Sequence, residues 1–208
     1  MSEAFSSEAE KASRRENATM KGSPAAVFWL TGPPASGKTT LARALAARLG
    51  GLGLAVAILD GDDLRRGPCR DLGFSEADRL ENMRRAAEAA LTLSDCGVIA
   101  ILALVSPLAE GRRLARARLA GRPFFEIHLD APLEIRRARD PKGLYAQAAR
   151  GEIHGLTGYD APYEPPEAPE LRLDSAALGL AESVEAALNL CAPLSAARPP
   201  AGSRRNPA

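Results

Sequence analysis

The residues with the clearest chemical purpose form a glycine-rich loop that matches the pattern G-x-x-x-x-G-K-[ST]. Its glycines allow successive backbone N–H groups to turn toward phosphate oxygens, and the following helix adds its positive N-terminal dipole. We expect Lys38 to reach the β and γ phosphates and the Thr39 hydroxyl to face a magnesium ion. The phosphate-binding set is Gly32, Pro33, Pro34, Ala35, Ser36, Gly37, Lys38, Thr39 and Thr40. The sequence therefore predicts a site for a nucleoside triphosphate with Mg²⁺.

The segments on both sides of this loop suit that role. Residues 26–31 (AVFWLT) form a short apolar strand candidate before the loop. Apolar side chains recur at helical spacing after it, at Leu41, Ala42, Leu45, Ala46 and Leu49. A chance glycine-rich turn between a strand and a helix is the alternative, and the two matching flanks count against it.

Carboxylates follow the second strand candidate, residues 54–59, in the run DGDDLR. Ligands of open α/β sheets gather at the carboxyl ends of strands, so Asp60 and Asp62 can face the bound nucleotide. They could hold Mg²⁺ directly or through water, and one could accept the proton of an attacking hydroxyl. A simple turn or a helix cap is the alternative for these residues.

A helix candidate begins near Ser75, because Asp78 three residues later completes a pattern similar to a capping box. One buried stripe then follows, traced by Leu80, Met83, Ala87, Leu91 and Ser94. Arg79 and Asn82 lie three residues apart on a neighbouring face, where both could contact one polar ligand. An ordinary solvated helix flank is the alternative.

The order of these elements predicts the fold class. Further apolar strand candidates at residues 98–105, 124–129 and 171–173 alternate with amphipathic helices. Such alternation is typical of an α/β fold, here a P-loop NTPase-type three-layer sandwich with a five-stranded parallel sheet and helices on both faces. We expect one domain over residues 24–194, with loose tails at 1–23 and 195–208.

Composition excludes several other classes of protein. The chain has 208 residues, is 46% apolar and carries a formal net charge of +1, with no basic cluster of the kind that binds nucleic acid. We expect no membrane insertion, because no apolar stretch reaches the roughly 20 residues that a bilayer requires. Cys69, Cys96 and Cys191 lack metal-binding spacing and cannot all pair, which favours a reducing, cytoplasmic location.

Beyond the loop, several motifs follow one another along residues 26–174. They are WLTG, DGD with LR, DLGFS with DR and EN, SP, RDPKGLY, and TG with PYE. Together they resemble adenylylsulfate kinases, which phosphorylate the 3′-hydroxyl of adenosine 5′-phosphosulfate (APS). The resemblance implies that the γ-phosphate of MgATP is transferred to that hydroxyl, giving 3′-phosphoadenylyl sulfate in sulfate assimilation. It also implies a mobile lid over the RDPKGLY motif.

The resemblance assigns one group of residues to the acceptor, APS. Arg65, Arg79 and Asn82 would bind the phosphosulfate, whose dense negative charge suits a planar guanidinium fork. Phe74 would stack on the adenine, and Leu156 would face its other side, where the family usually has Phe. The complete set is Asp62, Arg65, Phe74, Arg79, Asn82, Lys142, Gly143, Leu144 and Leu156.

The resemblance assigns other residues to the donor and to catalysis. Asp62 would orient or deprotonate the 3′-hydroxyl, and Asp60 would support the metal beside Thr39. Lys142 on the lid would neutralise charge on the moving phosphoryl group, and Arg139 would lie near the ATP base. Lid closure would exclude water, which otherwise competes as the acceptor. The catalytic set is Lys38, Asp62, Lys142 and Ser106.

Ser106 has two interpretations. Related enzymes are often described with a phosphoserine intermediate at this position, although direct in-line transfer needs no such step. Ser106 before Pro107 is also the pattern of a helix N-cap followed by Pro at the first helical position. The sequence favours the cap and leaves both interpretations open.

Some positions depart from the family pattern on the acceptor side. Leu156 keeps only part of the roughly 1–3 kcal/mol of base–aromatic stacking, so we expect a lower substrate affinity. Residues 67–71 lose an Asn, and Leu108, Ala109 and Gly111 replace the usual aromatic, Arg and Asp. These changes bear on specificity more than on reaction type.

The sequence leaves two alternative functions open. The same fold could phosphorylate another small alcohol such as gluconate, a sugar or an antibiotic, although an uncharged sugar would offer nothing to the cationic acceptor residues. A catalytically silent nucleotide-binding subunit is the other alternative, against which the intact Lys38, Asp62 and Lys142 speak. The family analogy implies a homodimer and a sulfurylase partner.

Overall fold

A parallel β-sheet forms the centre of the computed structural model, which describes residues 25–191. Its strands are β1 (Val27–Thr31), β2 (Val56–Asp60), β3 (Ile99–Ala103), β4 (Phe124–Asp130) and β5 (Leu171–Asp174). Within this range the sheet has five strands in the order β2-β3-β1-β4-β5, and every pairing is parallel. The phosphate loop therefore leaves the central strand, and its neighbours β3 and β4 end beside it.

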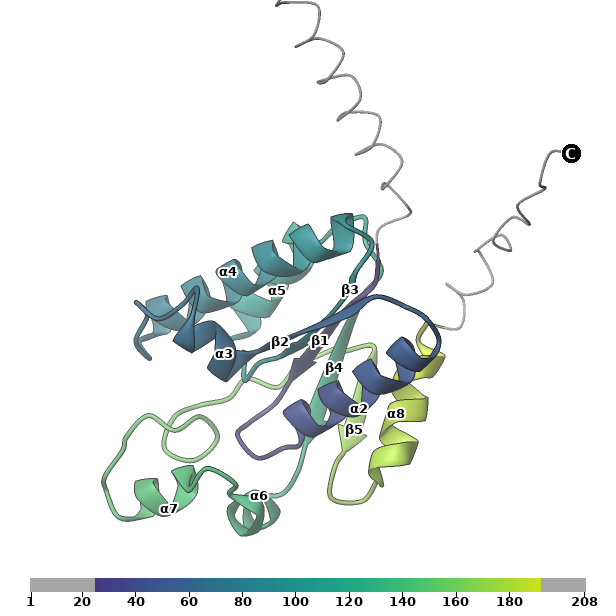
Figure 1. The fold of residues 1–208 in the computed structure, drawn as a ribbon. Helices are drawn as coiled ribbons and strands as arrows, with labels where there is room; N and C mark the ends of the chain where they lie inside the picture. The colour runs from purple at the N-terminus through teal and green to yellow at the C-terminus, as the bar shows by residue number, and fades with distance from the viewer. Residues whose placement is uncertain (1–24, 192–208) are drawn as a thin grey trace, which may run out of the picture.

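Helices cover both faces of the sheet (Figure 1). The helices are α2 (Lys38–Gly51), α3 (Gly61–Arg66), α4 (Glu76–Asp95), α5 (Ala109–Arg118), α6 (Leu133–Arg139), α7 (Leu144–Ala149) and α8 (Leu180–Asn189). Helices α2 and α8 pack on one face, over alternate residues of β1 such as Phe28 and Leu30. Helices α4 and α5 pack on the other face, over Val27 and Trp29. Because side chains alternate along a strand, this central strand is buried on both sides.

The predicted fold class is confirmed: the structure is a three-layer α/β sandwich with the predicted parallel sheet. Each strand lies within two residues of its predicted position, which is the usual uncertainty at element ends. The helix predicted near Ser75 begins at Glu76, and the Ser75 hydroxyl accepts a hydrogen bond from the backbone N–H of Asp78 at 3.1 Å. The predicted tails, residues 1–23 and 195–208, lie outside the described residues.

A long excursion between β4 and β5, residues 131–170, carries α6 and α7 beyond the carboxyl ends of the strands (Figure 1). We call it the lid segment, because the RDPKGLY motif falls within it. Tyr145 of α7 is buried and donates a hydrogen bond from its hydroxyl to the carbonyl of Pro34 at 3.0 Å. The lid segment is thus tied directly to the phosphate loop. Within residues 25–191 no helix combines the length and apolar character that crossing a membrane requires.

Candidate active site

The phosphate loop turns sharply between β1 and α2 because of two glycines. Gly32 has φ 151°, and a Cβ there would lie 2.2 Å from the carbonyl oxygen of Leu129 on β4. Gly37 precedes α2 with φ 95°, in the left-handed region that glycine enters without steric cost. The loop backbone can therefore pass close to β4 and still direct the start of α2 into the cleft.

Lys38 lies at the mouth of this loop and is buried. Its ammonium donates to the carbonyls of Gly32 and Pro33 at 2.7 Å each, and to the Ser36 hydroxyl at 3.3 Å. Burial, followed by the charge of Lys142, lowers the pKa of Lys38 to about 7, although Asp60 acts in the opposite direction. An anion that approached this ammonium would favour its charged form.

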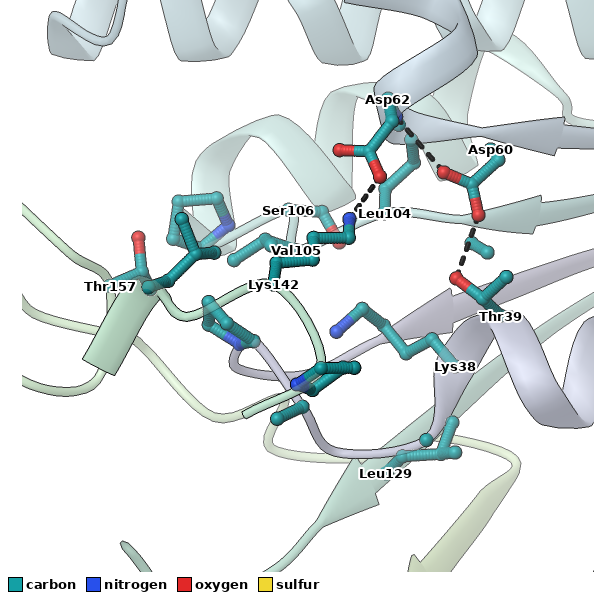
Figure 2. Close-up of a pocket in the computed structure, with 18 of the residues that line it drawn as sticks. Lys38, Thr39, Asp60, Asp62, Leu104, Val105, Ser106, Leu129, Lys142 and Thr157 are labelled. Carbon is teal, nitrogen blue, oxygen red and sulfur yellow. Dashed lines mark hydrogen bonds and ion pairs between the residues drawn. The ribbon is translucent and has the colours of Figure 1, made fainter. Parts of the chain in front are cut away.

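Thr39 and Asp60 bring two hard oxygen ligands together. The Thr39 hydroxyl donates to Asp60 Oδ2 at 2.7 Å, while Asp60 Oδ1 accepts from the backbone N–H of Asp62 at 3.0 Å (Figure 2). Asp60 is thus the N-cap of α3, which was the alternative reading, and it also contacts the metal candidate Thr39. Among residues 25–191 no group of three or more His, Cys, Asp or Glu could hold a metal. A hydroxyl and a carboxylate fit Mg²⁺ bound chiefly through phosphates and water.

Asp62 lies in the first turn of α3 and forms an ion pair with Lys142 of the lid segment (Figure 2). Both side chains are about half exposed. The ion pair joins the lid to the end of β2 across the cleft, above Lys38. The predicted base and the predicted lid cation therefore lie in contact.

Two guanidinium groups flank the exposed ring of Phe74. The Arg65 guanidinium lies 4.3 Å from the ring centroid and that of Arg79 lies 5.7 Å from it. Arg79 also donates to the Thr157 hydroxyl at 2.9 Å and to the carbonyl of Gly155 at 3.0 Å, so it connects α4 to the lid segment. Burial and the neighbouring Arg65 lower the pKa of Arg79. The residues predicted to bind the acceptor thus form a cluster of positive charge.

Asn82 completes this cluster from within α4. Its side chain is buried, and its Nδ2 has no hydrogen-bond partner in the part of the chain that the structure describes. A buried donor without a partner costs roughly 1–3 kcal/mol. The solvated-flank interpretation is therefore wrong for Asn82, which lines the cleft together with Arg79.

The helix-cap interpretation of Ser106 is also wrong. Helix α5 begins at Ala109 with Leu108 as its N-cap residue, and the Ala109 N–H donates to the Glu164 carboxylate at 2.6 Å. Ser106 is buried with φ 38°; its hydroxyl donates to Thr31 Oγ1 at 2.7 Å and accepts from Trp29 Nε1 at 3.2 Å. The Glu164 carboxylate, far away in the sequence, caps α5, and the Ser106 hydroxyl forms its hydrogen bonds with Trp29 and Thr31 of β1.

All of these groups face one cleft with a volume of about 1150 Å³. The predicted residues that line it are Pro34, Ala35, Gly37, Lys38, Thr39, Thr40, Asp60, Asp62, Arg65, Phe74, Arg79, Asn82, Ser106, Arg139, Lys142, Leu144 and Leu156. Gly32, Pro33, Ser36 and Gly143 are not among its lining residues: the first three shape the phosphate loop from beneath, and Gly143 precedes α7.

The cleft also has lining residues that the sequence analysis missed. At the end beside α2, Ser175 accepts from the Arg139 guanidinium through its hydroxyl at 2.9 Å, and Leu178 and Leu180 expose about half of their surface or less. At the acceptor end, His154 lies close to Leu156. No motif marks these positions in the sequence.

The family model for adenylylsulphate kinases matches residues 24–174. An adenylyl-sulfate kinase of Marinobacter nauticus is 43% identical over 175 residues, covering 84% of this chain and 88% of its own length. The bifunctional enzyme NodQ of Rhizobium sp. strain N33 is 47% identical over 173 residues, covering 83% of this chain; the chain spans 27% of NodQ.

Solved structures give the same likeness. The APS kinase of Mycobacterium tuberculosis, determined with AMPPNP and APS, has a TM-score of 0.79 and 43% identity, covering 81% of this chain and 98% of its own. A hexameric APS kinase from Thiobacillus denitrificans has a TM-score of 0.63 and 34% identity, covering 85% of this chain and 30% of its own. Both proteins extend the similarity from single motifs to the whole arrangement of strands and helices.

Proposed function

Because this chain belongs to the adenylylsulfate kinase family, we propose that it transfers the γ-phosphoryl group of MgATP to the 3′-hydroxyl of APS. The products are ADP and 3′-phosphoadenylyl sulfate, an intermediate of sulfate assimilation. The observation that carries the proposal is one cleft with two anion sites. The phosphate loop with Lys38 occupies one end, and the cluster of Arg65, Arg79 and Asn82 occupies the other.

At the donor end the chain holds the triphosphate. Backbone N–H groups of the loop and the start of α2 face its phosphates, and Lys38 exchanges loop carbonyls for β- and γ-phosphate oxygens. Thr39 and Asp60 would hold the magnesium ion, which neutralises charge on those oxygens. Arg139, fixed by Ser175, presents a planar cation to the ATP base.

At the acceptor end the phosphosulfate meets two guanidinium groups and the free amide donor of Asn82. Phe74 and Leu156 lie at the same end of the cleft and would enclose the adenine. A sugar or gluconate would leave these cations without a charged partner of this density, so another small alcohol is the weaker candidate.

Transfer then proceeds in line between the two sites. Asp62 accepts the proton of the 3′-hydroxyl, whose oxygen forms a bond to the γ-phosphorus while the bond from that phosphorus to the bridging oxygen breaks and ADP leaves. Lys142 leaves Asp62 and follows the negative charge of the moving phosphoryl group. Asp62 therefore becomes free to act as a base only when the phosphoryl group is present to attract Lys142.

Ser106 contributes by position in this scheme. Its hydroxyl is buried between Trp29 and Thr31, so direct transfer to the acceptor is favoured over a phosphoserine. For direct transfer, Ser106→Ala should retain substantial turnover. Intact-protein mass spectrometry of the wild type incubated with ATP should show no added phosphate, whose mass is roughly 80 Da. A phosphorylated Ser106 that decays upon APS addition would overturn it.

The reaction is tested by mass spectrometry of the product made from ATP, Mg²⁺ and APS. Fragmentation should place the new phosphate on the 3′-oxygen. Faster ADP release with gluconate or a sugar than with APS would reject the acceptor, and no ADP release with any acceptor would favour a silent nucleotide-binding subunit.

Two substitutions test the assigned roles. Lys38→Ala should abolish turnover, and Asp62→Ala should lower kcat by roughly 10²–10⁴-fold, the usual contribution of a general base. Circular dichroism of both variants should match the wild type, which separates lost chemistry from lost fold. Near-normal kinetics in either variant would refute its role.

We also propose a homodimer that operates in the cytoplasm, with a sulfurylase as a functional partner. A hexamer is known for the Thiobacillus denitrificans relative, and the relative NodQ is bifunctional, so association and fusion both occur among relatives. Light scattering of the purified protein would decide the oligomeric state, and a coupled assay with a sulfurylase would test the partnership.

A further inference from the structure

The lid segment is fastened to the turn after β3 largely through one residue, Glu164. Its carboxylate accepts from the backbone N–H of Ala109 at 2.6 Å, its own N–H donates to the carbonyl of Pro107 at 3.0 Å, and its carbonyl accepts from the Arg112 guanidinium at 2.6 Å. Arg112 in turn donates to the carbonyl of Ser106 at 2.7 Å. Glu164 therefore both caps α5 and holds the turn that contributes Ser106 and Pro107 to the cleft.

The residue before Glu164 secures the same segment to the central strand. The Tyr163 hydroxyl lies 3.0 Å from Thr31 Oγ1, at the point where β1 enters the phosphate loop. The Tyr163 ring stacks on His128 with centroids 5.7 Å apart. Burial raises the pKa of Tyr163 to about 12, so the phenol stays neutral and can take part in this hydrogen bond. Together the two side chains fix the lid segment at this end.

The other end of the same stretch forms the acceptor wall. Gly155 and Thr157 accept hydrogen bonds from Arg79, and Leu156 between them is buried against the cleft. The wall is closed by Asp160, whose carboxylate accepts from the N–H groups of Gly155 and Leu156 at 2.9 and 2.5 Å, and only residues 161–163 separate Asp160 from Glu164 along the chain. A shift of the Glu164 anchor would therefore move the wall relative to Arg79.

We propose that Glu164 is a positioning residue for the acceptor nucleotide, one that sets the distance between the wall at residues 155–157 and the turn at residues 106–107. This inference rests on the proposed function. Glu164 is not among the residues that line the cleft, so its effect would pass through the two walls that it joins. Loss of the anchor should weaken acceptor binding and leave the phosphate loop, which has its own hydrogen bonds, in place.

The test compares Glu164→Ala with Glu164→Gln and with a matched control, Glu170→Ala. Glu170 also accepts from a backbone N–H, that of Glu126 at 2.6 Å, and pairs with Arg116 at 2.7 Å, but it does not line the cleft. We expect Glu164→Ala to raise the KM for APS about tenfold, which corresponds to about 1.4 kcal/mol, and to change the KM for ATP less than twofold. Glu164→Gln keeps an acceptor oxygen and should restore most of the affinity. Glu170→Ala should lower stability without this difference between the two KM values.

Hydrogen exchange supplies a readout that needs no turnover. In Glu164→Ala the amides of residues 155–161 should exchange faster than in the wild type or in Glu170→Ala. Equal changes in both KM values, or unchanged exchange at these amides, would overturn the positioning role. A wild-type enzyme that fails to phosphorylate APS in the same assay would instead overturn the proposed function. The exchange rates at residues 155–161 would still test whether Glu164 holds this wall in place.

Discussion

The charge on Lys38 is set by its burial, and this gives nucleotide binding a pH dependence. The pKa of Lys38 in the free protein is lowered to about 7, and phosphate oxygens beside the ammonium would raise it again. The bound state therefore holds more protons than the free state above pH 7, so binding takes up a proton there, and affinity falls as the pH rises above about 7.

Calorimetry in buffers of different ionisation enthalpy measures this uptake directly. At pH 8 the binding of MgATP should take up close to one proton. Lys38→Arg, whose guanidinium stays charged, is the control and should show almost none. Equal proton uptake in both proteins would assign it to another group.

Leu156 tests the acceptor pocket at the same scale. It is buried, lines the cleft and occupies the position expected to face the adenine of APS. Base–aromatic stacking is worth roughly 1–3 kcal/mol, so Leu156→Phe should lower the KM for APS by several fold and leave that for ATP unchanged. A higher KM for APS would place the adenine elsewhere in the cleft.

At the scale of elements, Gly111 allows α5 to pack closely against α4. A Cβ at Gly111 would lie 2.0 Å from Met83 Cε and 3.2 Å from Leu80 Cδ2, and Met83 lines the cleft. This position is one of those that depart from the family pattern. The change to glycine therefore fits a close helix contact beneath the acceptor site.

Gly111→Ala should consequently destabilise the protein in spite of the better helix propensity of alanine. Because Met83 is buried, its methyl group cannot move aside freely, and overpacking costs about 1–3 kcal/mol, against a gain of about 0.8–1 kcal/mol from propensity. Gly50→Ala in α2 is the matched control, since its Cβ would meet nothing within 4 Å. Thermal unfolding should give a lower Tm for the Gly111 variant and a higher one for the Gly50 variant. The same direction of change in both would contradict close packing at Gly111.

At the scale of the whole molecule, the cleft is built from segments far apart in the chain. The phosphate loop, α3, α4, the turn after β3 and the lid segment all contribute to it. A ligand that contacts all of them should stabilise the fold as a unit. At 100 times its Kd the expected gain is about 2.7 kcal/mol, or several degrees in Tm for a domain of this size.

MgATP should therefore raise the Tm. EDTA added with ATP should reduce the rise, because the nucleotide would then lack the metal that Thr39 and Asp60 would hold. EDTA alone should leave the Tm unchanged, since no cluster of metal-binding side chains occurs within residues 25–191. A fall in Tm with EDTA alone would reveal a structural metal site.

The sequence by itself determined the local features. Examples are the phosphate loop, the succession of apolar strands along the chain and the helix cap at Ser75. Each depends on residues close together in the chain, and periodicity and spacing report such features directly. Most of the residues that the resemblance assigned to the site also line the cleft.

The tertiary structure decided whatever depends on partners distant in the chain. Helix α5 is capped by Glu164 and not by Ser106, which lies 58 positions earlier in the sequence. Asn82 is buried, and its Nδ2 donor has no partner among the described residues. The tertiary structure also lowered the pKa of Lys38 through burial and placed Lys142 against Asp62. Each of these outcomes follows from desolvation or from a contact across the fold, and neither is encoded in local spacing.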